Sequence, residues 1–179
     1  MARGKMIRRF TLAALAAAFT ACSEPTGLDR SATPLSLLPG ELKKTQLVEC
    51  PTDITETTTV VILGGVLGEV TVAGHRVTIP AGALLPGVYL VTLTAPASKY
   101  VEIEATVNGL TQFTFLEPVE VVIDYGRCTR SDIDRAPLQA WYINSLTKEP
   151  IENMGGIDDK VAREVKFNTN HFSGYALAQ

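Results

Sequence analysis

The chain has 179 residues, with 16 lysines and arginines against 19 aspartates and glutamates, and a formal net charge of −3. Hydrophobic residues make up 46% and charged residues 20%, values that are ordinary for a globular protein and exclude a collagen-like, coiled-coil or largely disordered chain. The absence of a basic surplus argues against a nucleic-acid partner, and three cysteines are too few for a disulfide-dense miniprotein.

The first 21 residues have the pattern of an export signal rather than of a folded element. Four basic residues precede an apolar run over residues 10–21. A helix of that length is too short for a bilayer core of roughly 30 Å, and a basic head before a short apolar run is typical of a signal peptide. We interpret residues 1–21 in this way, with initiation at Met1 or Met6; a buried or amphipathic helix is the alternative.

The apolar run ends in the letters FTAC, which resemble a bacterial lipobox with Cys22 as the lipidated residue. In that motif the cysteine becomes the first mature residue, its sulfur takes a diacylglycerol and its amine takes an acyl chain. The resemblance implies a lipoprotein signal peptide over residues 1–21 and a covalent lipid on Cys22, palmitate included, with no other cofactor. The lipid would hold the protein at a membrane without a spanning helix. Cleavage after Ala18 is the alternative.

The expected location is therefore the bacterial cell envelope. Ser23, in place of an aspartate, resembles the pattern of lipoproteins that are sent to the outer membrane. Without residues 1–21 the chain keeps 12 basic and 19 acidic residues, a formal net charge of −7. Residues 22–44 are rich in Ser, Thr, Pro and Gly and show no periodicity, which predicts a flexible tether.

Residues 45–179 are predicted to form one all-β domain. Apolar and polar residues alternate strictly over 101–108, with Val101, Ile103, Ala105 and Val107 inward and Glu102 on the wet face. Similar patterns predict strands over 46–50, 58–63, 69–72, 76–79, 88–94, 111–115, 119–123, 139–144, 161–167 and 174–178. Many short strands at this spacing indicate an antiparallel β-sandwich.

Two local signals refine this prediction. Asn108-Gly109 between two alternating runs predicts a β-hairpin. The one helical candidate is a turn or two over residues 131–135, which Ser131 could cap.

Four motifs occur in order along the domain: GG at 64–65, VTIPAGAL at 77–84, FLEPV at 115–119 and HFSGY at 171–175. Together they resemble the ZU-five domain, an antiparallel β-sandwich of zonula occludens scaffolds, netrin receptors and ankyrins, and above all its small bacterial secreted or lipoprotein versions. Each motif also has a structural interpretation: Pro80 ends a strand, and Glu117-Pro118 begins one. The resemblance implies a platform for protein contacts.

The tripeptide His171-Phe172-Ser173 carries one chemical hypothesis. Some members of the resembled family cleave their own chain between Phe and Ser of this motif. Here the Ser173 hydroxyl would attack the Phe172 carbonyl with His171 as general base, and water would hydrolyse the resulting ester. The alternative is that Phe172 is a core side chain of the last strands and that His171 and Ser173 lie at the edge, so no catalytic residue is firmly assigned.

Cys50 and Cys128 are the two cysteines left after lipidation of Cys22, and in an oxidising envelope they are predicted to form a disulfide. His75 is predicted to lie in a solvated hairpin turn. No carboxylate lies at ligand spacing from either histidine, and the acidic turns at 132–134 and 158–159 lack the spacing of a calcium loop, so we predict no metal site.

The resulting hypothesis is a lipid-anchored, non-catalytic envelope protein that contacts the membrane through its lipid and an unknown protein through its sandwich. Self-cleavage at Phe172-Ser173 is one alternative. The other is a surface lipoprotein that binds a carbohydrate or peptide through an aromatic patch of Trp141, Tyr142, Tyr125 and Tyr175.

Overall fold

The computed structural model describes residues 45–129, 131 and 133–179, so the predicted signal peptide, Cys22 and the predicted tether lie outside the described residues. The described chain forms strands and turns, with no helix among these residues. The strands are β1 (Glu49–Thr52), β2 (Glu56–Leu63), β3 (Gly68–Val72), β4 (His75–Ile79), β5 (Val88–Ala95), β6 (Ser98–Tyr100), β7 (Glu102–Val107), β8 (Phe113–Asp124), β9 (Gln139–Ile143), β10 (Pro150–Gly155), β11 (Ile157–Asp159), β12 (Glu164–Phe172) and β13 (Gly174–Ala178).

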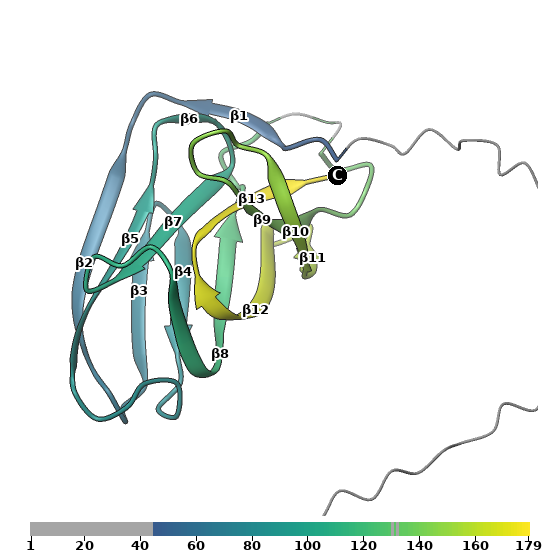
Figure 1. The fold of residues 1–179 in the computed structure, drawn as a ribbon. Helices are drawn as coiled ribbons and strands as arrows, with labels where there is room; N and C mark the ends of the chain where they lie inside the picture. Colours follow the sequence, from purple (N-terminus) through teal and green to yellow (C-terminus); the bar gives the residue numbers. More distant parts are fainter. Residues whose placement is uncertain (1–44, 130, 132) are drawn as a thin grey trace, which may run out of the picture. The chain divides into compact units, whose positions relative to one another are not determined.

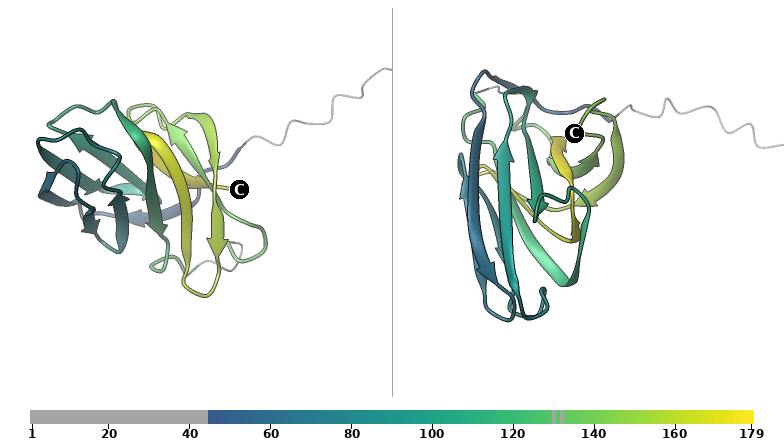
Figure 2. Two further views of the ribbon diagram at one scale, coloured as in Figure 1. Left: turned by 90° about the horizontal axis from the view of Figure 1, so that it is seen from below. Right: turned by 60° about the vertical axis from the view of Figure 1, so that its left-hand side comes forward.

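The strands form two antiparallel sheets that pack as a sandwich (Figure 1). One sheet has the order β10-β9-β13-β7-β5-β2 and the other has the order β11-β12-β8-β4-β3. β1 and β6 pair as a small ribbon across one end, and β2 runs along the outer margin (Figures 1 and 2). The predicted all-β class and the predicted antiparallel sandwich are confirmed.

The core follows the alternation that the sequence predicts. Val101, Ile103, Ala105 and Val107 all lie in the buried cluster between the sheets, at 3% exposure or less. Burial of each valine or isoleucine side chain contributes about 1.5–3 kcal/mol, so a segment of this pattern contributes much to the stability of the sandwich.

Two short turns rely on backbone conformations that glycine favours. Ala73 and Gly74 have φ values of 47° and 86° and join β3 to β4, and Asn108 and Gly109 have φ values of 52° and 77°. Positive φ at both central residues is the geometry of the two-residue hairpin turn. The turn at 108–109 forms as predicted, but it closes a single pair, Val107 with Leu110, before β8 crosses to the other sheet.

β8 corrects the prediction of two separate strands over 111–115 and 119–123. It is one strand, and Glu117-Pro118 lies inside it instead of beginning a strand. Thr114 pairs with His171 and Val119 pairs with Thr169, so residues 115–118 form a bulge opposite a single residue of β12. A bulge is where a strand tolerates proline, because the missing N–H is not needed for pairing.

Three further boundaries differ from the prediction. Val161 lies in the turn before β12 and is 96% exposed, because Tyr125 N–H pairs with the Arg163 carbonyl and the sheet ladder begins only at Glu164. The first strand begins at Glu49, and before it Leu47 makes only an isolated bridge to Ala178. The described residues of 131–135 form turns rather than a helix, so Ser131 caps no helix there.

Candidate functional site

The HFS motif lies where β12 ends and β13 begins. Phe172 is fully buried, with its ring 4.7 Å from that of Phe115, which in turn lies 5.1 Å from Phe113. Phe172 also pairs with Phe113 across the strands. The interpretation of Phe172 as a core side chain is therefore correct, and this aromatic row anchors the end of β12 to β8.

His171 is half-buried and its contacts run to Tyr175. Its ring Nδ1 is 3.2 Å from the Tyr175 hydroxyl, which donates a hydrogen bond to the His171 carbonyl and lies 3.1 Å from the Thr169 hydroxyl. Burial raises the pKa of Tyr175, so this hydroxyl stays protonated. The imidazole therefore belongs to a network that closes the β12–β13 connection.

Ser173 is 8% exposed, and its carbonyl accepts a hydrogen bond of 3.2 Å from the Ala105 N–H. Within the described chain, the His171 ring contacts Tyr142 and Tyr175 and makes no hydrogen bond to the Ser173 hydroxyl. Phe172 and Ser173 are not among the described residues with a left-handed backbone. The structure brings His171 and Ser173 to the same hollow but does not pair them as base and nucleophile.

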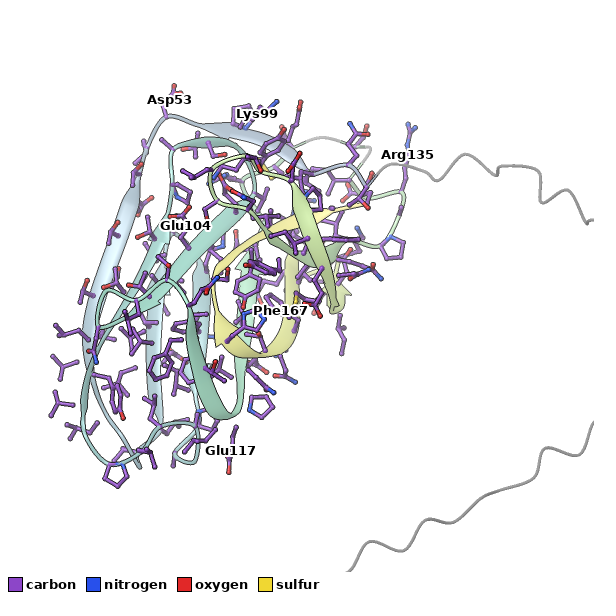
Figure 3. All side chains as sticks on the ribbon, in the orientation of Figure 1. Asp53, Lys99, Glu104, Glu117, Arg135 and Phe167 are labelled. Atoms are coloured by element: carbon purple, nitrogen blue, oxygen red, sulfur yellow. A yellow bond between two sulfur atoms is a disulfide. The ribbon has the colours of Figure 1, made fainter. Side chains whose placement is uncertain are left out.

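Two adjoining hollows open around this motif. One, of about 280 Å³, contains His171 and Ser173 in its wall, and the other, of about 510 Å³, contains Glu104 and Asn144; Tyr142 lines both. Glu104 lies on β7, in the upper left part of the view in Figure 3. Both hollows are open and partly polar, so they could hold water or a small polar group.

The predicted disulfide is confirmed. Cys50 of β1 is bonded to Cys128 in the segment after β8, with the two Cα atoms 5.5 Å apart. Two arginines reinforce the junction: Arg127 donates to the Cys50 carbonyl at 3.1 Å, and Arg163 donates to the Cys128 carbonyl at 2.6 Å. The bridge therefore fastens the small ribbon to the segment between β8 and β9.

Asp158 lies in the edge strand β11, and not in a turn as predicted, and it supports that same segment. Its carboxylate accepts hydrogen bonds from the Tyr125 hydroxyl at 2.6 Å and from the Leu138 N–H at 2.6 Å, and it forms an ion pair with Lys160 at 2.7 Å. The Lys160 ammonium also donates to the Ile133 and Ala136 carbonyls. The carboxylate is engaged by the fold and serves to position this segment.

His75 overturns the prediction of a solvated turn residue. It is the first residue of β4 and is 1% exposed. Its Nδ1 accepts a hydrogen bond of 3.0 Å from the Asp124 N–H, and its Nε2 is buried without a hydrogen-bond partner. The alternation of β4 directs residue 75 inward, together with Val77 and Ile79, and this tertiary register outweighs the polarity of the ring.

The burial of His75 makes stability depend on pH. Desolvation lowers its pKa from 6.5 to about 4, against the opposing effect of Asp124. Between these values the unfolded chain binds a proton that the folded chain does not, so the free energy of unfolding should fall by about 3 kcal/mol as pH drops from 6.5 to 4. Urea unfolding at a series of pH values measures this slope. His75→Asn, which keeps an acceptor near the Nδ1 position, should flatten it; an equal slope in both proteins would contradict the assignment.

The predicted aromatic patch does not form. Tyr125 and Tyr175 are fully buried in the main core, whereas Trp141 packs against a second cluster with Leu47. Tyr142 alone of the four lines the hollows around Ser173. The patch prediction is wrong because adjacent residues of β9 point to opposite faces, and because Tyr125 and Tyr175 point into the core.

A buried ion pair was missed by the sequence analysis. Glu102, which alternation placed on the wet face, is 2% exposed, and Lys148 Nζ lies 2.8 Å from its Oε2. The carboxylate has no hydrogen-bond partner of good geometry, so charge attraction holds the pair. The turn between β9 and β10 covers this face. It packs so closely on Gly174 that a side chain at this position would collide with Ser145. Lys148 has a positive φ of 61°, and a lysine does not indicate such a turn conformation in the sequence.

Two other kinds of feature, a metal centre and a membrane-spanning helix, are absent from the part of the chain that the structure describes. Among residues 45–129, 131 and 133–179, no group of three or more His, Cys, Asp or Glu side chains is arranged to hold a metal ion. No helix in that part of the chain is long and apolar enough to cross a membrane. The predicted lipidation site, Cys22, lies outside the described residues. No family model, no curated protein and no solved structure matches this chain.

Proposed function

We propose that this chain is a lipid-anchored protein of a bacterial cell envelope. Its β-sandwich binds other proteins and has no catalytic activity of its own. The observation that carries the interaction role is an exposed aliphatic surface on β2, β5 and their turns. It consists of six side chains that are each 50–67% exposed: Val61, Leu63, Val66, Leu85, Val88 and Leu90. Contiguous apolar surface of this kind marks interaction sites on soluble domains.

Two further observations support this proposal. The four ordered motifs resemble those of ZU-five domains, whose members serve as platforms for protein contacts. In the motif His171-Phe172-Ser173, the first two residues pair with β8 and the His171 ring contacts Tyr175. These contacts favour a structural role for the motif. The sequence around Cys22 supplies the anchor, and its lipid would keep the domain at the membrane.

The anchor is tested by the intact mass of the full chain extracted from the membranes of a bacterial host. The expected species begins at Cys22, carries the mass of a diacylglyceryl group with an added acyl chain, and ends at Gln179. Cys22→Ser should release the protein from the membrane fraction, whereas the matched control Ser23→Ala should leave it there. An unmodified Cys22, or a chain that keeps residues 1–21, would contradict the anchor.

Self-cleavage is the alternative function, and the same spectrum decides it. Breakage between Phe172 and Ser173 would remove seven residues, 173–179, and Ser173→Ala would prevent the loss. We expect the chain to keep these residues after long incubation at neutral pH, because the imidazole of His171 is engaged with Tyr175. If the wild-type chain is truncated while the Ser173→Ala chain stays intact, the protein cleaves itself and the proposal of a non-catalytic protein is wrong.

A further inference from the structure

The two sheets have four edge strands in the described chain, and three of them carry features that discourage pairing with another strand. β3 has five residues and an ion pair between Glu69 and Arg76 at 4.0 Å. β10 begins at Pro150 and has two register shifts against β9. β11 has three residues, of which two are aspartates. Short length, charge, proline and bulges are the usual protection of a sheet edge.

β2 has none of this protection. It is eight residues long, pairs with β5 without a register shift, and contains no proline, lysine or arginine. Its one charged residue is Glu56, at its first position. β5 is its only sheet partner in the described chain, so the outward N–H and C=O groups along its other side have no strand partner among those residues. Such an edge is a template for an added strand.

The outer face of β2 and β5 changes character along its length. Near the start of β2, Thr57 and Thr59 contact Thr94 and Thr92 through hydroxyl hydrogen bonds of 3.1 and 2.9 Å. Further along, the facing pairs become Val61 with Leu90 and Leu63 with Val88, which belong to the aliphatic surface. In Figure 3, side chains drawn only in carbon project outward from the lower part of β2.

The adjoining turns extend this surface without adding charge. Gly64 N–H bonds to the Gly87 carbonyl at 2.8 Å, which brings the β2–β3 turn beside the β4–β5 connection. Residues 60–68 and 80–91 contain no charged side chain. Side chains of this size expose about 100 Å² each when free, so the aliphatic surface presents about 300–400 Å² of apolar area. Since roughly 60% of an interface is apolar, a contact that covered all of this area would measure about 600 Å² per copy, at the lower end of the range for stable interfaces.

We propose that β2 pairs with β2 of a second copy of this chain, so that the two six-stranded sheets join across a two-fold axis. Antiparallel pairing of a strand with itself satisfies a two-fold axis, and the strand that each copy contributes carries a single charged residue, Glu56, at its first position. A lipid surface would cover the aliphatic side chains but would leave the backbone groups of the edge unpaired. This inference rests on the proposed interaction role and names its partner.

Native mass spectrometry of the full chain, released from detergent micelles across a dilution series, tests the dimer. We expect a dimer for the wild-type chain and a dissociation constant raised more than about 100-fold by Val61→Lys, because the axis would bring two like charges together. The matched control is Ile157→Lys, at a residue that is 75% exposed on the edge strand β11, and it should leave the dimer intact.

A milder double variant, Val61→Thr with Leu63→Thr, guards against misfolding because it extends the threonine row already present on β2. It should keep the circular dichroism of the wild-type chain and weaken the dimer. A monomeric wild-type chain, a dimer that survives Val61→Lys, or an equal loss in Ile157→Lys would each overturn the proposal. The subunit mass in the same spectra reports the lipid on Cys22, so a failure of the anchor is seen separately from a failure of the dimer.

Discussion

Replacement of Lys148 by methionine is expected to lower the free energy of unfolding by about 3–5 kcal/mol. Methionine keeps the apolar stem of the side chain and removes the ammonium that lies 2.8 Å from Glu102. The Glu102 side chain is 1% exposed, so its carboxylate would lose its counter-charge in a place where water cannot replace it. Urea unfolding at neutral pH, followed by circular dichroism, measures the loss.

A double variant separates the charge from the packing. Lys148→Met combined with Glu102→Gln removes both charges, so it should recover most of the stability that Lys148→Met alone loses. The backbone of residue 148 has a positive φ in each of these proteins, which keeps its strain constant in the comparison. Equal destabilisation of the single and the double variant would show that the turn between β9 and β10, rather than the ion pair, carries the effect.

Removal of the Cys50–Cys128 bridge is expected to cost about 4 kcal/mol, because it closes a loop whose ends are 78 residues apart. The bridge joins β1 to the segment after β8, so its loss removes a covalent link between two parts of the chain that lie far apart in sequence. Urea unfolding with and without reductant measures the change. The double variant Cys50→Ser with Cys128→Ser should match the reduced wild-type chain and should not respond to reductant.

The result that would contradict this prediction is a reduced chain that unfolds at the same urea concentration as the oxidised one. Two arginines give such an outcome a physical route, since Arg127 and Arg163 hold the carbonyls of the two cysteines. A charge-assisted hydrogen bond of this kind contributes about 1.5–3 kcal/mol. Arg127→Lys, which keeps the charge and loses the planar donor pair, would then reveal their share.

The class of fold could be predicted because β-structure depends on local alternation. Val101, Ile103, Ala105 and Val107 predicted a buried face and occupy one. Asn108-Gly109 predicted a turn with positive φ and forms one. Phe172 as a core residue followed from residue type, and the Cys50–Cys128 pair followed from residue type and from the expected export of the chain. In each case the signal lies within a few residues or in the chemistry of the side chain.

The candidate site was predictable only in part. Phe172 was correctly predicted to be a core residue, but Ser173 is buried rather than at an edge, and nothing in the local sequence indicated that the His171 ring would contact Tyr175. The aromatic patch failed because Tyr125 and Tyr175 became core residues. The aliphatic surface consists of residues that sequence analysis treats as core, and they are exposed because β2 lies at an edge and its outer face has no covering layer.

Residue order therefore predicted most of the strands, though not β6, β10 or β11, together with the turn at 108–109, the disulfide and the inward side chains of β7. The burial of Glu102 and His75, the fusion of two expected strands into β8 and the unprotected edge at β2 depend on which segments pack together. Alternation tells which side chains share a face, because it arises within one strand. Whether a second layer covers that face depends on contacts between residues far apart in the chain, and single-strand patterns carry no record of them.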